Sequence, residues 1–143
     1  MKKLSPLLLL LALWACETDD DIPLTNRYFK LVEVAQLPAL NYDPDGSPPD
    51  LRVDIKRRSA NFWEFSTGTE VNAASLPTFV VFPAEILATD EVYEIRIVDE
   101  DLNQPVDDEI FFWTFHALDD GSGGYIDFYD NDRLVMSLNY NEK

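Results

Sequence analysis

Short runs in which apolar and polar residues alternate recur along the chain from about residue 28 onward. Such alternation is typical of half-buried β-strands, because successive side chains of a strand point to opposite faces. The run 51–56, for example, alternates leucine, valine and isoleucine with charged residues. The pattern predicts eight strands, at residues 29–34, 51–56, 62–65, 79–82, 92–97, 110–115, 125–129 and 134–140.

The spacing of these strands predicts the fold class. Eight short strands within about 115 residues, separated by turn-forming residues, are typical of an all-β protein with two packed antiparallel sheets. We therefore expect an eight-stranded antiparallel β-sandwich, with at most one helical turn at residues 84–87. If the strands alternate in direction, the loops after the first, third, fifth and seventh strands open at the same end.

The first residues are typical of an export signal. Two lysines precede a leucine-rich stretch that is too short for the ~20 residues of a membrane-spanning helix, so we interpret residues 1–15 as a signal peptide. The stretch ends in Leu-Trp-Ala-Cys, which resembles the bacterial lipobox and predicts that Cys16 carries a lipid anchor. An ordinary signal peptide with an incidental cysteine is the alternative.

The residues that follow Cys16 are rich in acid and predict a solvated tether over residues 16–27, before a folded domain at 28–143. The acidic run also resembles the signal that sends some lipoproteins to the cell surface. We therefore expect an exported protein anchored in the outer membrane, with surface exposure as a further possibility.

Composition excludes several kinds of function. The chain has 27 acidic and 11 basic residues and a net charge of −16, which makes nucleic acid an improbable partner. Removal of residues 1–15, which hold two lysines and no acid, changes this charge to −18. One cysteine and one histidine, His116, exclude an internal disulfide and the usual zinc sites. We expect no enzymatic activity, because His116 has no nucleophile motif nearby and paired acids alone do not define a glycosidase.

Aspartates gather in the predicted loops. Asp99 and Asp101 follow the strand at 92–97, and residues two apart in an extended chain point the same way. Asp107 and Asp108 return where the next strand begins, and the loop before residue 51 contains Asp43 and Asp50 (together with Asp45). Neighbouring carboxylates repel one another unless a cation lies between them, and Ca²⁺ accepts six to eight oxygen ligands. The alternative is that aspartate merely favours turns in an acidic protein.

Three segments together resemble a C2 domain, a calcium- and lipid-binding β-sandwich. Residues 31–53 are similar to its first strand, first calcium loop and second strand, residues 67–79 to its second loop, and residues 95–110 to its third calcium loop. The resemblance implies the circularly permuted strand order of that family. It also implies calcium ligands at Asp43, Asp50, Asp99, Asp101 and Asp108, with Asp107 as a substitute for its neighbour.

The sequence departs from the family pattern in three ways. The first loop is one residue longer than is usual in the family. Pro-Asp-Leu-Arg at 49–52 replaces the usual Ser-Asp-Pro-Tyr, and Phe111 replaces a glycine. The function we expect is that of a membrane-anchored interaction module that binds Ca²⁺ through its aspartate-rich loops, and the resemblance implies anionic phospholipid as one candidate partner. The alternative is a surface lipoprotein that binds glycan or protein without metal.

Overall fold

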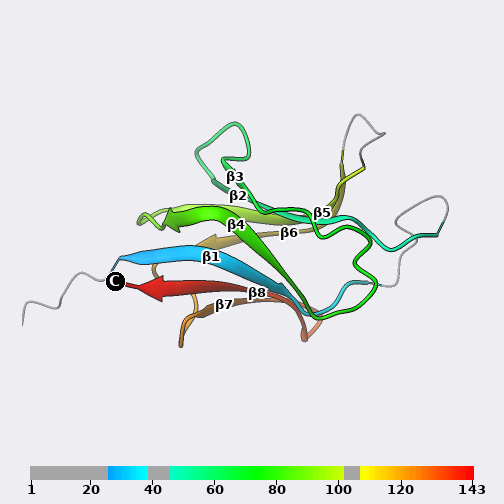
Figure 1. Cartoon of the computed structure of the whole chain (residues 1–143). Coiled ribbons are helices and arrows are strands. Elements are labelled where there is room, and N and C mark those ends of the chain that lie inside the picture. The colour runs from blue at the N-terminus through cyan, green and yellow to red at the C-terminus, as the bar shows by residue number, and fades with distance from the viewer. Residues whose placement is uncertain (1–25, 39–45, 102–106) are drawn as a thin grey trace, which may run out of the picture.

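The computed structural model describes residues 26–38, 46–101 and 107–143, and it is a two-layer β-sandwich (Figure 1). One four-stranded sheet, sheet A, has the order β4-β1-β8-β7, and the other, sheet B, has the order β3-β2-β5-β6. All neighbouring strands are antiparallel. The strands are β1 (Arg27–Val34), β2 (Leu51–Arg57), β3 (Phe65–Ser66), β4 (Thr78–Leu87), β5 (Val92–Asp99), β6 (Asp108–His116), β7 (Tyr125–Asp130) and β8 (Arg133–Glu142). The predicted eight-stranded antiparallel sandwich is therefore confirmed.

Aromatic side chains join the two sheets in the core. Phe29 of β1 is fully buried, and its ring lies 6.2 Å from Tyr93 of β5 and 5.9 Å from Phe115 of β6. Phe128 of β7 packs edge-on against Phe115 at 5.5 Å. These edge-to-face contacts add to the area that the rings bury, so this cluster ties sheet A to sheet B.

Alternating strand direction places four connections at one end of the sandwich, which we call the loop end: β1–β2, β3–β4, β5–β6 and β7–β8 (Figure 1). In sheet B, the register sets Leu51 opposite Asp99 and Asp99 opposite Asp108 at this end. Asn26 and Lys143 hydrogen-bond to each other at the opposite end. Within the described residues, no helix is long and apolar enough to cross a membrane.

The expected third strand is mostly wrong. Only Phe65 and Ser66 pair with β2, whereas Phe62 and Trp63 lie in the preceding turn. The Trp63 ring instead lies 4.4 Å from the guanidinium carbon of Arg96 and contacts Phe112 edge-on. An aromatic run that alternation assigned to a strand therefore covers the outer face of sheet B.

The helical turn expected at residues 84–87 is also wrong, because these residues form the end of β4. In the ladder between β1 and β4, Leu31 pairs with Val81 and Phe29 pairs with Ile86. One residue of β1 is thus opposite four residues of β4, so residues 82–85 bulge out of the ladder. Pro83 lies in this bulge, where its missing N–H breaks no ladder hydrogen bond because β4 is an edge strand.

Candidate site at the loop end

Two of the predicted ligands are in direct contact. The backbone N–H of Asp50, just before β2, donates to Oδ1 of Asp99, the last residue of β5, at 2.7 Å. The N–H of Glu100 in turn donates to the carbonyl of Asp50 at 2.8 Å. Asp99 is almost completely buried. The first and third of the predicted calcium loops are thus fixed to each other by backbone and side-chain hydrogen bonds.

The β3–β4 connection, predicted as the second loop, also contacts Asp50. The N–H of Asn72 donates to Oδ1 of Asp50 at 2.7 Å, and the N–H of Ala73 donates to the carbonyl of Pro49 at 2.9 Å. Asn72 has a φ of 51°, a left-handed conformation that asparagine tolerates better than most residues. Three connections that are distant in the sequence therefore converge on Asp50.

The other predicted ligands are distributed around this pair. Asp108 is exposed and lies directly opposite Asp99 in the ladder, which sets both residues on the same face of sheet B. Asp101 is half-buried two residues after Asp99. Asp43 and Cys16 lie outside the described residues. In the described part of the chain, no group of three or more His, Cys, Asp or Glu side chains is arranged to hold a metal ion.

An arginine that sequence reasoning did not single out lies beside this pair. The guanidinium of Arg52 contacts Oδ1 of Asp54 at 2.9 Å through Nε and Oδ2 of Asp107 at 2.5 Å through Nη2, and it also pairs with Glu100. Asp107 is thus held by Arg52 on the outer side of sheet B. Arg52 and Asp54 alternate along β2 and so share a face, which is the pattern that would have revealed the pair.

Asp54 is the centre of this charge network. Its carboxylate also contacts Arg96 of β5, with Nη2 to Oδ2 at 2.8 Å. Burial alone would raise the pKa of Asp54, but hydrogen bonds from Arg52, Ser66 and Arg96 and the charge of Arg52 lower it below its usual value. Burial would likewise lower the pKa of Arg52, yet Asp54 and Asp107 raise it. Asp54 and Arg52 are therefore both charged at neutral pH.

The network also reaches the β3–β4 connection, because the hydroxyl of Thr69 hydrogen-bonds to Glu100, the residue that also pairs with Arg52. Arg52 thus offsets part of the negative charge that the sequence places in the loops. Asp99 and Asp108 share one face of sheet B at the strand ends, whereas Arg52 and the acids that it binds lie on the other.

No protein-family model matches this chain, and no curated protein matches it. The resemblance to C2 domains therefore stays a prediction, and the function must be inferred from the geometry.

His116, the only histidine, lies at the end opposite to the loop end, where β6 finishes. Its Nδ1 is 3.2 Å from Oδ2 of Asp119, and its Nε2 is 3.6 Å from Oδ1 of Asp90. Both aspartates are exposed. His116 therefore lies beside two exposed carboxylates at the surface, well apart from the aspartates of the loop end.

Proposed function

We propose that this protein is a Ca²⁺-binding interaction module, held on a membrane through a lipid on Cys16, whose metal site is the loop end. The observation that carries the proposal is the contact between Asp50 and Asp99 at the point where three connections converge. The proposed ligands are Asp43, Asp50, Asp99, Asp101 and Asp108, whereas Asp107 is held by Arg52.

The chemistry of the pair favours a divalent cation. The Asp99 carboxylate is almost completely buried beside the backbone of Asp50, and Asp108 lies opposite it in the ladder. Carboxylates that a fold gathers at one end of a sheet repel one another unless positive charge compensates. Ca²⁺ accepts carboxylate and backbone carbonyl oxygens in irregular geometry, whereas Mg²⁺ requires a stricter octahedron and retains more water. An assembly of loops from three connections provides the irregular oxygen set that Ca²⁺ accepts.

The net charge supports a calcium-dependent partner. Without its first 15 residues the chain has a charge of −18, which repels an anionic surface. Bound Ca²⁺ would neutralise the loop end locally, so that anionic phospholipid could approach there, as the resemblance to C2 domains implies. Binding of such a membrane should therefore require calcium.

Thermal unfolding of residues 16–143 with Ca²⁺ and with chelator tests the metal site. Calcium at a hundredfold excess over Kd should stabilise the fold by ~2.7 kcal/mol, which is roughly 10 °C for a domain of this size. The variant Asp99→Asn keeps an oxygen that accepts the N–H of Asp50 but loses the charge, so it should fold and lose most of the shift. Asp90→Asn, at an exposed position of the opposite end, is the matched control and should respond like the wild type.

An unchanged melting temperature at millimolar calcium would overturn the proposed metal site. Sedimentation with vesicles of phosphatidylserine and phosphatidylcholine then tests the partner. Binding that appears only with calcium supports the proposal, whereas calcium binding without vesicle binding would restrict the function to metal binding and a different partner.

A further inference from the structure

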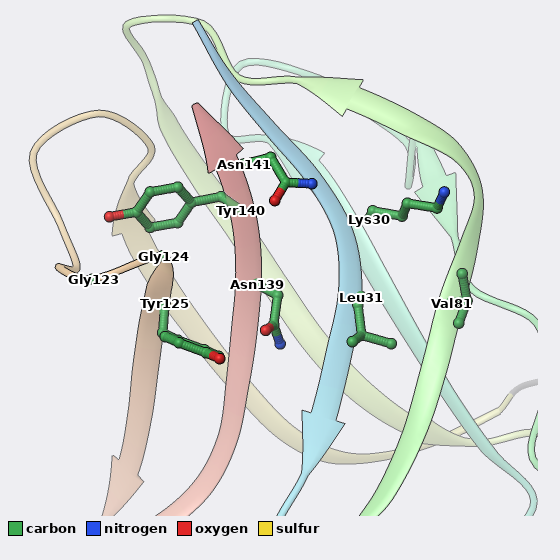
Figure 2. A pocket seen from close by; sticks show the side chains of 9 residues that line it. All are labelled: Lys30, Leu31, Val81, Gly123, Gly124, Tyr125, Asn139, Tyr140 and Asn141. Carbon is green, nitrogen blue, oxygen red and sulfur yellow. The ribbon is translucent and has the colours of Figure 1, made fainter. Parts of the chain in front are cut away.

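The outer face of sheet A has a hollow of about 460 Å³ that lies away from the loop end (Figure 2). Four of its lining residues form one continuous row across the sheet, because Tyr125 pairs with Asn139, Asn139 with Leu31, and Leu31 with Val81. One residue of the row comes from each strand of the sheet. In Figure 2 the side chains of this row lie side by side on the same face of the sheet.

Glycine opens one side of this hollow. Gly123 and Gly124 lie in the turn before β7 with φ values of 63° and 92°, and both line the hollow. A Cβ at Gly123 would meet no atom within 4 Å, so the space above it is empty. The ring of Tyr125 beside them is 47% exposed, which leaves an aromatic surface accessible to a ligand.

Polar groups line the hollow across the sheet from this ring (Figure 2). Asn139 is half-buried within the row, and Asn141 and Lys30 are exposed at its margin. The Asn139 amide donates one hydrogen bond to the carbonyl of Ser137 at 3.4 Å. An asparagine amide has two donors and one acceptor oxygen, so the hollow still offers both donors and acceptors. An apolar protein partner would have to bury these amides, at a cost unless each found a partner.

A second aromatic residue extends the surface along β7. Tyr129, like Tyr125, is exposed and lies on the outer face, and the strand rise places the two about 13 Å apart. Asp127 lies between them and accepts a hydrogen bond from the Ser137 hydroxyl at 2.5 Å. Along β7, the outer face therefore presents the ring of Tyr125, the carboxylate of Asp127 and the ring of Tyr129 in that order.

We infer that this face binds a neutral oligosaccharide. A sugar ring offers an apolar C–H face that can pack on tyrosine, and its hydroxyl groups both donate and accept hydrogen bonds. Both features match a tyrosine on β7 with two asparagine amides on the neighbouring strand β8. The volume is within the range of small-molecule sites. The strong negative charge of the chain favours a neutral ligand over an acidic one.

This inference does not rest on the proposed calcium site, because none of the loop-end aspartates that the structure describes lines the hollow. Binding at the hollow should persist in chelator and in the Asp99→Asn variant. Failure at one site is therefore distinguishable from failure at the other.

An array of neutral and acidic glycans, probed with residues 16–143 in chelator, tests the inference. We expect binding to at least one neutral glycan, which is then titrated as a soluble oligosaccharide. Tyr125→Ala should weaken binding at least tenfold, whereas Tyr125→Phe should retain most of it, because the ring rather than the hydroxyl makes the packing contact. Phe62→Ala, at a 70% exposed aromatic residue of the other layer, is the matched control and should leave affinity unchanged.

Thermal unfolding verifies that each variant folds. If Tyr125→Ala does not fold, Asn141→Ala replaces it, because Asn141 is exposed at the margin of the hollow. It should also lower affinity. Any one of four results would overturn the inference: no neutral glycan bound, acidic glycans alone bound, affinity unchanged by Tyr125→Ala and Asn141→Ala, or equal loss in Phe62→Ala.

Discussion

Replacement of Asp54 by alanine should destabilise the fold far more than loss of an ordinary surface ion pair. Asp54 is 1% exposed and contacts both Arg52 and Arg96. The variant leaves two guanidinium groups close together without the carboxylate between them. Removal of one member of a buried ion pair typically costs ~3–5 kcal/mol.

The structure places the expected cost at the lower end of that range. The side chains of Arg52 and Arg96 are 15% and 18% exposed, and Arg52 retains Glu100 and Asp107 as partners. We therefore expect Asp54→Ala to lower the free energy of unfolding by roughly 3 kcal/mol at pH 7. Glu142→Ala, which removes an exposed partner of Arg27, should cost less than about 1 kcal/mol.

The cost should also depend on pH with a defined sign. The folded-state pKa of Asp54 is below its usual value of 3.8, so its contribution to stability is present above that value and is lost as the pH falls through the folded pKa. The difference between wild type and Asp54→Ala should therefore be largest at neutral pH and shrink below about pH 4.

Urea denaturation of both proteins at pH 7 and pH 3 measures this difference directly. A cost below about 1 kcal/mol at pH 7, or one that is the same at both pH values, would refute the role we assign to the network. Glu142→Ala serves as the control in the same series.

Three further substitutions test the core and one turn. Phe29→Ala removes the ring that contacts Tyr93 and Phe115 and should lower the free energy of unfolding by about 4 kcal/mol, measured by urea denaturation. Gly121→Ala combines a φ of 84° with a Cβ only 2.3 Å from the carbonyl oxygen of Tyr125, and it should cost about 3 kcal/mol. Gly123→Ala has the same backbone strain without the clash and should cost only about 1 kcal/mol; equal costs in the two variants would show that the clash is relieved.

The sequence was sufficient to predict the strands that alternate, because their period of two follows from the backbone alone. The sequence was insufficient to predict the structure of the segment around Trp63. The apolar residues there suggested a strand, but the Trp63 ring covers the charged side chain of Arg96. The bulge at Pro83 was missed because it depends on β4 being an edge strand, and strand order is a property of long-range pairing.

The site at the loop end could be predicted only in part, because it too depends on long-range strand pairing. Spacing placed Asp99 at a strand end, but its contact with the N–H of Asp50 depends on the pairing of β2 with β5. The pairing of Asp107 with Arg52 depends on the same register and also on how β6 begins. Local patterns identify such acids, whereas only the sheet decides which of them an arginine neutralises.

The bulge in β4 affects how the protein behaves at high concentration. An edge strand with a regular row of free N–H and C=O groups can pair with the edge of another molecule, and long flat edges lead to aggregation. Pro83 and the bulge interrupt that row on β4, and β3 is only two residues long at the edge of sheet B. On β7, the indole N–H of Trp113 donates to the carbonyl of Tyr129 at 3.3 Å. At three of its four edges, the sandwich thus hinders the strand-to-strand growth by which concentrated β-proteins become fibres.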